Sequence, residues 1–394
     1  LDIAKLTYKK YIADNMHMVA SLHNHRAKMM LSGSNELIKL GSNLDGTVSK
    51  KDILGSLSLN IWDADLKKLG LMSDETTRPF VLALNATSAV NYSSLDVHST
   101  DMQISLESKQ KIKAFINQCS DFAGVLMKQI KKKNINQIKL KQVFPTANVI
   151  LDIGNENVIA QYINKNYGIS FKEISAAISA SREEGMNGYL TAQELNTGSF
   201  QLDTLRMKVQ QDSTRLNLSA QVLNNNKNDY IFSAKANGYI QGDSAKMLLS
   251  VLDKDKKEGI RVDVLGQMKD GGVSVNFCND KQILAYRPIK INGNNLVSVD
   301  KTGRIKANLD IKDDIGTEIS ILSNDSIQYK QFLMANIKNL NTAELVKSLP
   351  FLPPIGGLLN TDVSYIEKQG KRFIVHSNAE LLEAQYTGLA LGVL

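Results

Sequence analysis

Three histidines are the first candidates for chemistry in this chain, because neutral imidazole is a common metal ligand. His17, His23 and His25 lie close together in the sequence. Their spacing does not place them on one helical face, since helix neighbours are three or four residues apart. No acidic residue lies between His17 and His25 to complete a ligand set. The cluster therefore favours surface histidines over a metal site.

A pair of carboxylates, Asp63 and Asp65, raises the question of acid–base catalysis. Two residues apart at the end of a strand, the two side chains would share a face. The apolar residues that follow, Leu66 and Leu69, indicate that the strand leaves into a turn there. We therefore expect these carboxylates to have no catalytic role.

A third acidic group, Asp253, Asp255 and Glu258, alternates with lysines and loosely resembles a calcium-binding loop. The loop glycine and its spacing to a terminal glutamate are missing, so a charged hairpin tip is the better prediction. The sequence also contains no phosphate-binding glycine loop, no G-x-S-x-G elbow and no paired-histidine zinc motif. We expect no enzyme activity, no cofactor and no metal.

The composition is that of a folded chain of 394 residues, with 43% hydrophobic and 22% charged residues. The net charge of +7 is spread along the chain without the aromatic-lined basic stripe that nucleic-acid binding requires. The two cysteines, Cys119 and Cys278, exclude a disulfide-rich scaffold, and whether they pair stays open. No apolar run reaches the length of about 18 residues that a transmembrane helix needs. The abrupt apolar run Leu389–Leu394 suggests a strand cut off in a fragment of a longer protein.

Apolar residues that recur at every second position dominate the sequence and predict β-strands. The pattern begins with Phe80, Leu82, Leu84 and Ala86, and it sharpens after residue 197. Turn signals such as Asp270-Gly271-Gly272 separate the runs, which predicts strands that pair antiparallel in sequence order. Three architectures fit: a closed barrel, a two-sheet sandwich or one long curled sheet.

Three segments depart from this period and predict helices. Ile112–Ile130 has apolar residues three and four apart, as in an amphipathic helix. Asn155–Asn166 and Ser170–Arg182 read as a helix pair broken near Gly168, the first capped by Asn155, and Ile3–Met30 also reads as helical. The expected organisation is a helix with strands over 1–104, a helical insert over 105–197, and an antiparallel β groove over 198–394.

Several stretches carry a family resemblance. The sequence GSFQLDTL from Gly198 opens the sharpest alternation and leads through Gln211-Asp212 to LNLSA from Leu216. GRIKANL from Gly303, followed by ISILS from Ile319, repeats the pattern, and Leu345–Pro354 suggests a short leucine–proline helix before Gly356-Gly357. These features resemble the TamB family of AsmA-like bridge proteins. The resemblance covers the later part of the chain best, and the asparagine- and lysine-rich composition suits a Bacteroidetes relative.

The resemblance implies a β-taco, a long antiparallel sheet curled into an open groove with an amphipathic helical insert. It implies a periplasmic, cell-envelope scaffold that conducts phospholipid between the inner and outer membranes. Its partners would be phospholipid acyl chains and an outer-membrane BamA-like barrel protein, the latter contacted by a C-terminal part absent here. A segment also absent here would anchor it to the inner membrane.

The aliphatic residues expected to line the groove lie on one face of the late strands. They are Leu216, Leu218, Val262, Val264, Val273, Val275, Phe277, Ile305, Leu309, Ile319 and Ile321. Two other functions stay open. One is an assembly factor for outer-membrane proteins or autotransporters that acts by strand pairing at a sheet edge. The other is a secreted β-sandwich binding module, in which the same residues would form a closed core.

Overall fold

The structure is a computed structural model, which describes residues 2–8, 11–49, 52–68, 80–132, 136–198, 200–225, 231–269, 271–278, 281–370 and 372–386. The chain forms two compact units, the first of residues 1–124 and 141–208 and the second of residues 125–140 and 209–394. The expected strand over Leu389–Leu394 lies outside the described residues. The three-part division expected from the sequence stays a prediction.

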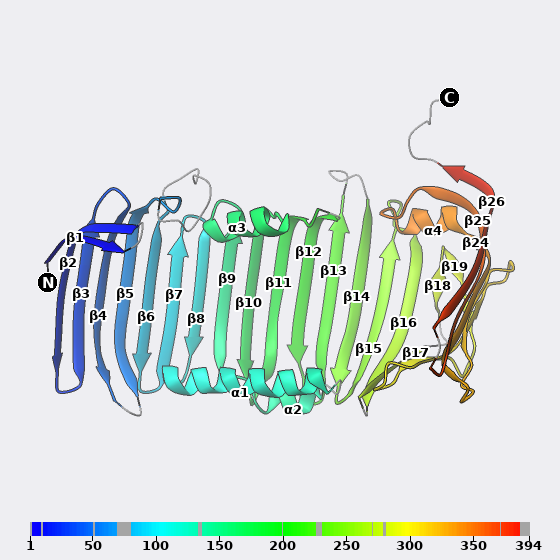
Figure 1. Ribbon diagram of the computed structural model, residues 1–394, viewed down its shortest axis with the longest axis horizontal. Coiled ribbons are helices and arrows are strands. Elements are labelled where there is room, and N and C mark those ends of the chain that lie inside the picture. The colour runs from blue at the N-terminus through cyan, green and yellow to red at the C-terminus, as the bar shows by residue number, and fades with distance from the viewer. Residues whose placement is uncertain are drawn as a thin grey trace, which may run out of the picture. The chain divides into compact units, whose positions relative to one another are not determined.

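The first unit is an antiparallel sheet in which each strand from β1 to β10 pairs with the next strand in the sequence (Figure 1). β12 (Gln201–Gln211) belongs to this unit as far as Lys208. The other strands are β1 (Asp2–Tyr8), β2 (Tyr11–His23), β3 (Arg26–Ser34), β4 (Ile38–Val48), β5 (Ile53–Ala64), β6 (Leu82–Ala89), β7 (Tyr92–Ser99), β8 (Met102–Ser108), β9 (Ala147–Gly154), β10 (Glu173–Ser181) and β11 (Gly185–Asn196).

The expected N-terminal helix over Ile3–Met30 is wrong, because this segment forms β1, β2 and the start of β3. The apolar residues Met16, Met18, Ala20 and Leu22 recur at every second position, which is the strand period. Asn24 and His25 both have positive φ, 46° and 65°, as a tight two-residue hairpin turn requires.

The histidines expected at the surface lie in this β2–β3 hairpin. His17 pairs across the ladder with Ser32, His23 pairs with Arg26, and His25 occupies the turn. Among the described residues, no group of three or more histidine, cysteine or acidic side chains is placed to hold a metal ion.

Helices interrupt the first sheet at two places. α1 (Ile112–Lys131) follows β8 and confirms the predicted amphipathic helix, and the short α2 (Gln137–Lys141) follows it. α3 (Val158–Tyr167) lies between β9 and β10 and ends at Gly168, whose φ of 64° is the left-handed conformation that favours glycine. The predicted break at Gly168 is confirmed.

The expected helix over Ser170–Arg182 is wrong, because Glu173–Ser181 forms strand β10. Ile174, Ala176, Ile178 and Ala180 alternate with other residues and pair with both β9 and β11. A row of isoleucine and alanine at every second position packs on a sheet face, whereas a helix would spread these residues around its circumference.

The cap of α3 is Asn157 and not the predicted Asn155. Its side-chain Oδ1 accepts the backbone N–H of Ala160 at 2.9 Å, and its Nδ2 donates to the Gly154 carbonyl at 2.7 Å. The Asn157 side chain is almost fully buried, at 2% exposure. The cap therefore ties the helix to the end of β9.

Replacing Asn157 with alanine should destabilise α3 by about 1–2 kcal/mol, because the helix loses its capping acceptor and leaves buried groups unpaired. Hydrogen exchange at the amides of α3 would measure the loss. Asn155→Ala is the matched control and should leave the exchange unchanged. Equal effects of the two substitutions would contradict the capping role of Asn157.

The second unit is also an antiparallel sheet, in which long strands flank a region of short ones. The long strands are β13 (Leu216–Asn224), β14 (Phe232–Gln241), β15 (Ser244–Leu252), β16 (Glu258–Lys269), β17 (Gly272–Phe277), β22 (Ile305–Lys312), β23 (Glu318–Ser323), β24 (Tyr329–Asn341), β25 (Ile355–Lys368) and β26 (Ile374–Tyr386). The short ones are β18 (Ile283–Leu284), β19 (Arg287–Pro288), β20 (Lys290–Ile291) and β21 (Leu296–Val299). The helix α4 (Thr342–Ser348) joins β24 to β25. A short helix before a glycine and a strand was expected over Leu345–Pro354, but it begins three residues earlier and ends at Ser348.

Side-chain amides replace missing ladder partners around the short strands. Gln282 accepts the N–H of Asp263 at 2.9 Å and donates to its carbonyl at 3.0 Å. Asn295 accepts the N–H of Phe277 at 2.6 Å and donates to its carbonyl at 2.9 Å. Gln331 accepts the N–H of Ile305 at 2.7 Å and donates to its carbonyl at 2.9 Å. A carboxamide has the donor and acceptor of a peptide group, so these three residues pair strand backbone where a neighbouring strand stops.

The prediction of a mainly β, antiparallel fold with few helices is confirmed. Neither unit closes into a barrel, and neither shows the strong curling along its whole sheet that the resemblance implied. Within the second unit the sheet bends at its short strands, so that β14–β16 face the viewer in Figure 1 while β24–β26 are seen nearly edge-on. The bend is therefore local to the region of short strands.

Candidate functional site: an apolar face across the strands

The ladder registers of the second unit show which side chains share a face, because directly opposed residues of antiparallel strands point to the same side. One row of opposed residues consists of Leu218 of β13, Gly238 of β14, Met247 of β15 and Val264 of β16. Val262 lies on the same side of β16 as Val264 and opposes Leu249 of β15. From β16 onward, Val264 opposes Phe277. The predicted residues of β13, β16 and β17 are therefore on one side of the sheet.

The same side continues from β17 to β23. Val275 opposes Val297 of β21, and Val273 opposes Val299, which in turn opposes Ile305 of β22. Leu309 of β22 opposes Ile321 of β23. The structure thus brings all eleven residues predicted for the groove to one face, which we call the apolar face of the second unit.

The opposite face is mostly polar. The residues next to those of the apolar face include Ser219, Lys246, Asp263, Ser274, Asn308 and Ser320. Lys246 and Asp263 form an ion pair across β15 and β16 at 3.2 Å, and this pair raises the pKa of Lys246. The sheet is therefore amphipathic, with charges and hydroxyls on one side and aliphatic groups on the other.

The apolar face is accessible and not a closed core. Leu218 is 40% exposed and only Leu309 of the eleven residues is fully buried, at 4%, whereas the others are half-buried. In a two-sheet sandwich these side chains would be covered by a second sheet. Aliphatic groups held at half exposure can bind flexible apolar ligands without directional contacts.

Several residues of this face were missed from the sequence. Met247, Leu249, Val297 and Val299 fill the rows between the predicted residues. Alternation in β15 was visible, and Leu249 and Met247 follow it. β21 has only four residues, too few to show a period, so only the ladder with β17 and β22 reveals Val297 and Val299.

The first unit has its own apolar face, whose residues were not among those expected to line a groove. Registers from β5 to β11 align aliphatic rows on one side. These half-buried or buried residues are Leu57, Leu59, Leu84, Ala86, Leu95, Val97, Ile104, Leu106, Val149, Leu151, Ala176 and Leu190. The alternation of Leu82, Leu84 and Ala86 in the sequence is the pattern that could have indicated this face.

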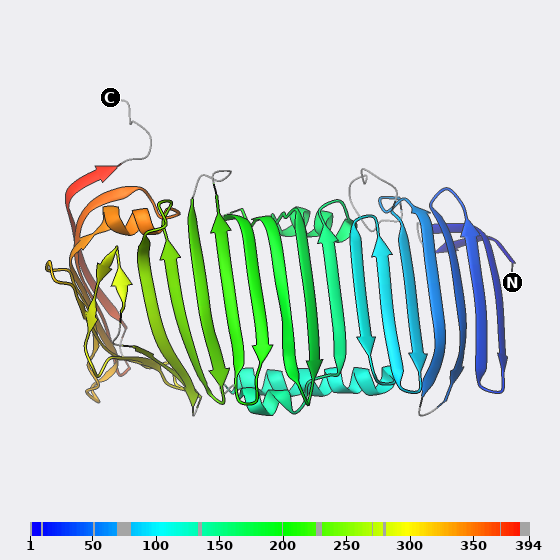
Figure 2. The ribbon, with the colours of Figure 1, turned by 180° about the vertical axis from the view of Figure 1, so that it is seen from behind.

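Helices lie at the ends of this first apolar face. Ala160 of α3 packs with Phe171 and with Met102 and Ile153, which oppose each other on β8 and β9. At the other end of the strands, Phe122 of α1 packs edge-on against Phe144 with ring centroids 5.6 Å apart. In Figure 1 the helices lie in front of the strands of this unit. Figure 2 is the view from behind, and there the strands lie in front of the helices.

In the second unit, α4 covers one end of the apolar face. The helix packs against β16 and β25. Phe351, which follows α4, packs edge-on against Phe232 of β14 with ring centroids 6.0 Å apart. The covered residues Phe232, Val251 and Ile260 are buried, in contrast to the half-exposed middle of the face.

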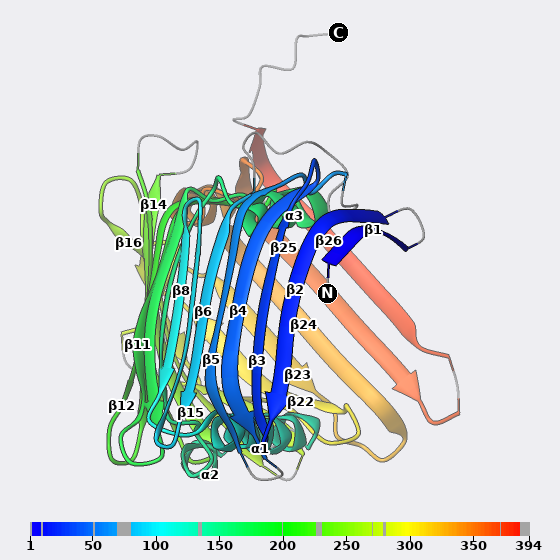
Figure 3. The same ribbon diagram turned by 90° about the vertical axis from the view of Figure 1, so that its left-hand side faces the viewer.

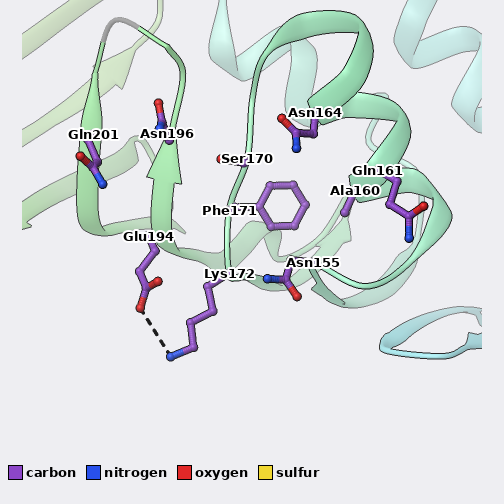
Figure 4. Close-up of a pocket in the computed structure, with 10 residues that line it drawn as sticks. All are labelled: Asn155, Ala160, Gln161, Asn164, Ser170, Phe171, Lys172, Glu194, Asn196 and Gln201. Atoms are coloured by element: carbon purple, nitrogen blue, oxygen red, sulfur yellow. Dashed lines mark ion pairs between the residues drawn. The ribbon is translucent and has the colours of Figure 1, made fainter. Parts of the chain in front are cut away.

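A separate, polar pocket of about 380 Å³ lies beside α3 in the first unit (Figure 4). Its lining contains the carboxamides of Asn155, Gln161, Asn164, Asn196 and Gln201. Lys172 and Glu194 form an ion pair at 3.5 Å at its rim, and Phe171 is almost fully buried behind it. These groups can hydrogen-bond a small polar molecule but offer no binding surface to an acyl chain.

The acidic group at the β15–β16 turn is a hairpin tip, as predicted. Oδ1 of Asp253 accepts the backbone N–H groups of Asp255 and Lys257 at 2.9 Å, and Oδ2 accepts the hydroxyl of Tyr286 at 2.7 Å. Burial and the hydrogen bond to Asp253 raise the pKa of Tyr286. The carboxylate is thus occupied by protein donors.

Two further features bear on chemistry. Cys119 and Cys278 form no disulfide with each other, and burial raises the pKa of Cys119. Among the described helices, none is long and apolar enough to cross a membrane.

Comparisons with known proteins add no relative. No protein-family model, curated protein or solved structure matches the chain.

Proposed function

We propose that this chain is a non-enzymatic scaffold that holds the acyl chains of phospholipid on its apolar sheet face and passes them between membranes of the cell envelope. The single observation that supports this most is the register of the second unit, which aligns partly exposed apolar residues from β13 to β23 on one face, with Gly238 and Gly266 between them. The resemblance to the TamB family supports a periplasmic location and a β-taco curl completed around lipid. A BamA-like barrel would be the outer-membrane partner.

The energetics suit this function. Each methylene exposed to water costs about 0.8 kcal/mol, so two chains of roughly 15 methylenes each cost roughly 24 kcal/mol in water. A continuous apolar surface removes much of this cost at every position along its length. Since the attraction is non-directional, the lipid can slide from one strand to the next without breaking specific contacts.

Neighbouring residues on opposite faces provide a direct test. A photo-crosslinking amino acid, benzoyl-phenylalanine, placed at Val275 should form covalent adducts with phospholipid in cells, because this side chain lies on the apolar face. The same amino acid at Ser274, one residue away on the polar face, should not. Mass spectrometry of the irradiated, purified chain measures the adducts.

The outcomes separate the proposal from its alternatives. Adducts at both positions, or at neither, would contradict lipid binding on this face. Adducts at Val275 with other polypeptides in place of lipid would favour an assembly factor for outer-membrane proteins.

A further inference from the structure

The end of α1 and the short α2 form a distinct surface of the second unit. Two hydrogen bonds anchor α2 to the ends of the strands. The backbone N–H of Gln137 donates to the Gly242 carbonyl in the β14–β15 turn at 3.0 Å, and its buried side chain donates to Oε1 of Gln211 at 2.8 Å. Gln129 of α1 accepts the N–H of Asn136 at 2.7 Å. α2 is thereby fixed to the strand ends, and the end of α1 is tied to the start of α2.

This surface has an unusual charge. Between Asp121 and Asp152 the sequence contains six lysines and no acidic residue. Four of these lysines are exposed: Lys128 and Lys131 of α1, Lys132 directly after it, and Lys139 of α2. A nearby carboxylate, Asp212, accepts backbone N–H groups of Thr214 and Arg215 within its own turn, and these bonds lower its pKa to about 2.

Large apolar side chains are exposed among these lysines. Met127 is 63% exposed, and Ile130 and Ile138 are each 49% exposed. Met127 is three residues from Ile130 and four from Lys131, so these side chains lie close together on α1. Val125 and Leu126 of the same helix are half-buried. Ile130 lies four residues after Leu126 and therefore borders both Leu126 and Met127, which leaves an exposed apolar edge on this helix.

We propose that this lysine-rich helical surface, formed by Met127, Lys128, Ile130, Lys131, Lys132, Ile138 and Lys139, docks on an anionic phospholipid bilayer. Exposed lysines are attracted by acidic headgroups, and apolar side chains between them enter the boundary between headgroups and acyl chains. This inference rests on the proposed function for its purpose, because docking there brings one end of the strands to the membrane that supplies or receives lipid.

The chemistry favours a bilayer over the other polyanions. Single-stranded nucleic acid is bound by aromatic side chains that stack on bases, and the surface defined above contains none. An acidic protein would satisfy the lysines but would also need a shaped apolar surface opposite Met127, Ile130 and Ile138. A fluid bilayer accepts these side chains at any spacing.

Vesicle sedimentation of the full chain tests the docking. The chain should bind vesicles of phosphatidylcholine with added phosphatidylglycerol at low salt, and bind pure phosphatidylcholine vesicles much less. The double variant Lys131→Gln with Lys139→Gln should weaken binding by roughly 25-fold, at about 1 kcal/mol or fivefold per lysine. Met127→Ser with Ile130→Ser should weaken it as well.

A matched control removes the same charge elsewhere. Lys254→Gln with Lys281→Gln changes two exposed lysines outside this surface and should leave binding within about twofold of the parent. Circular dichroism confirms that each variant is folded. Equal loss in the control and the test variant, absence of binding by the parent, or tighter binding to single-stranded DNA than to anionic vesicles would each overturn the proposal.

The two proposals fail independently. Lipid adducts at Val275 without vesicle binding would remove only the docking surface. Lysine-dependent vesicle binding without adducts at Val275 would remove the apolar face as a lipid site and leave a membrane-docked protein of another function.

Discussion

Val264→Asp should lower the phospholipid that co-purifies with the chain at least about tenfold, whereas Leu265→Asp should leave it unchanged. Val264 stands in the middle of the apolar face, opposite Met247 on one side and Phe277 on the other. A carboxylate there keeps its water shell, and an acyl chain laid over it would desolvate the charge at a cost of several kcal/mol. Since about 1.4 kcal/mol corresponds to tenfold in affinity, the expected loss is large.

The control lies one residue away. Leu265 points to the polar face, is 41% exposed and opposes Lys246 and Asn276. It receives the same charge on the same strand, so a general effect of the aspartate would appear in both variants. Quantitative lipid extraction and mass spectrometry of the purified proteins measure the difference.

A milder substitution at the same position distinguishes loss of lipid binding from unfolding. Val264→Thr keeps the shape of the side chain and replaces one methyl group with a hydroxyl, so the sheet should persist while lipid content falls by a smaller factor. Unchanged lipid content in both folded Val264 variants would show that lipid does not lie on this face.

Gly55→Ala should destabilise the first unit by at least about 3 kcal/mol, the largest stability effect that we expect from a single methyl group. Gly55 of β5 opposes Gly46 of β4 and has a φ of 154°, a conformation rarely adopted by other residues. A Cβ atom at this position would overlap the carbonyl oxygen of Asp45 and the Cα of Gly46. Both obstacles are backbone atoms, so the strands themselves would have to separate.

Hydrogen exchange and urea unfolding measure this loss, and protection should fall first in β4 and β5. Gly124→Ala is the matched control. Gly124 lies in α1 with open space around the position of its missing Cβ, so alanine there should be neutral or stabilise the helix by up to about 1 kcal/mol. Unchanged protection of β4 and β5 in Gly55→Ala would contradict the close approach of the two strands.

The sequence predicted most of the fold where strands are long and regularly alternating. β13 to β16 and β22 to β23 carry apolar residues at every second position, and turns rich in glycine or asparagine separate several of them. The eleven residues selected from these strands and from β17 share one face in the structure. That agreement follows from the strict period of two, since the residues of one strand face are given by counting.

The errors have physical causes. Ile3–Met30 is rich in methionine, alanine and lysine, which favour helices in isolation, but tertiary pairing with neighbouring strands overrides this propensity. β10 contains Ile174, Ala176, Ile178 and Ala180. Half of these residues are alanine, which favours helices, and this favoured the expected helix. A single sequence does not show which residues of two strands oppose each other. The cross-strand rows of both units, and the apolar face of the first unit, are therefore visible only in the strand pairing of the structure.

Nearly all of the ladders connect strands that are neighbours in the sequence, and this has a consequence for how such a chain can grow. Contacts of low sequence separation close small loops, so each hairpin can form as soon as its strands are available. Stability then behaves as a sum of nearest-neighbour terms, as in solenoid proteins. A whole hairpin can be added or deleted without redesigning a shared centre. The number of strands in each sheet is thus a property that evolution can adjust in steps of one hairpin.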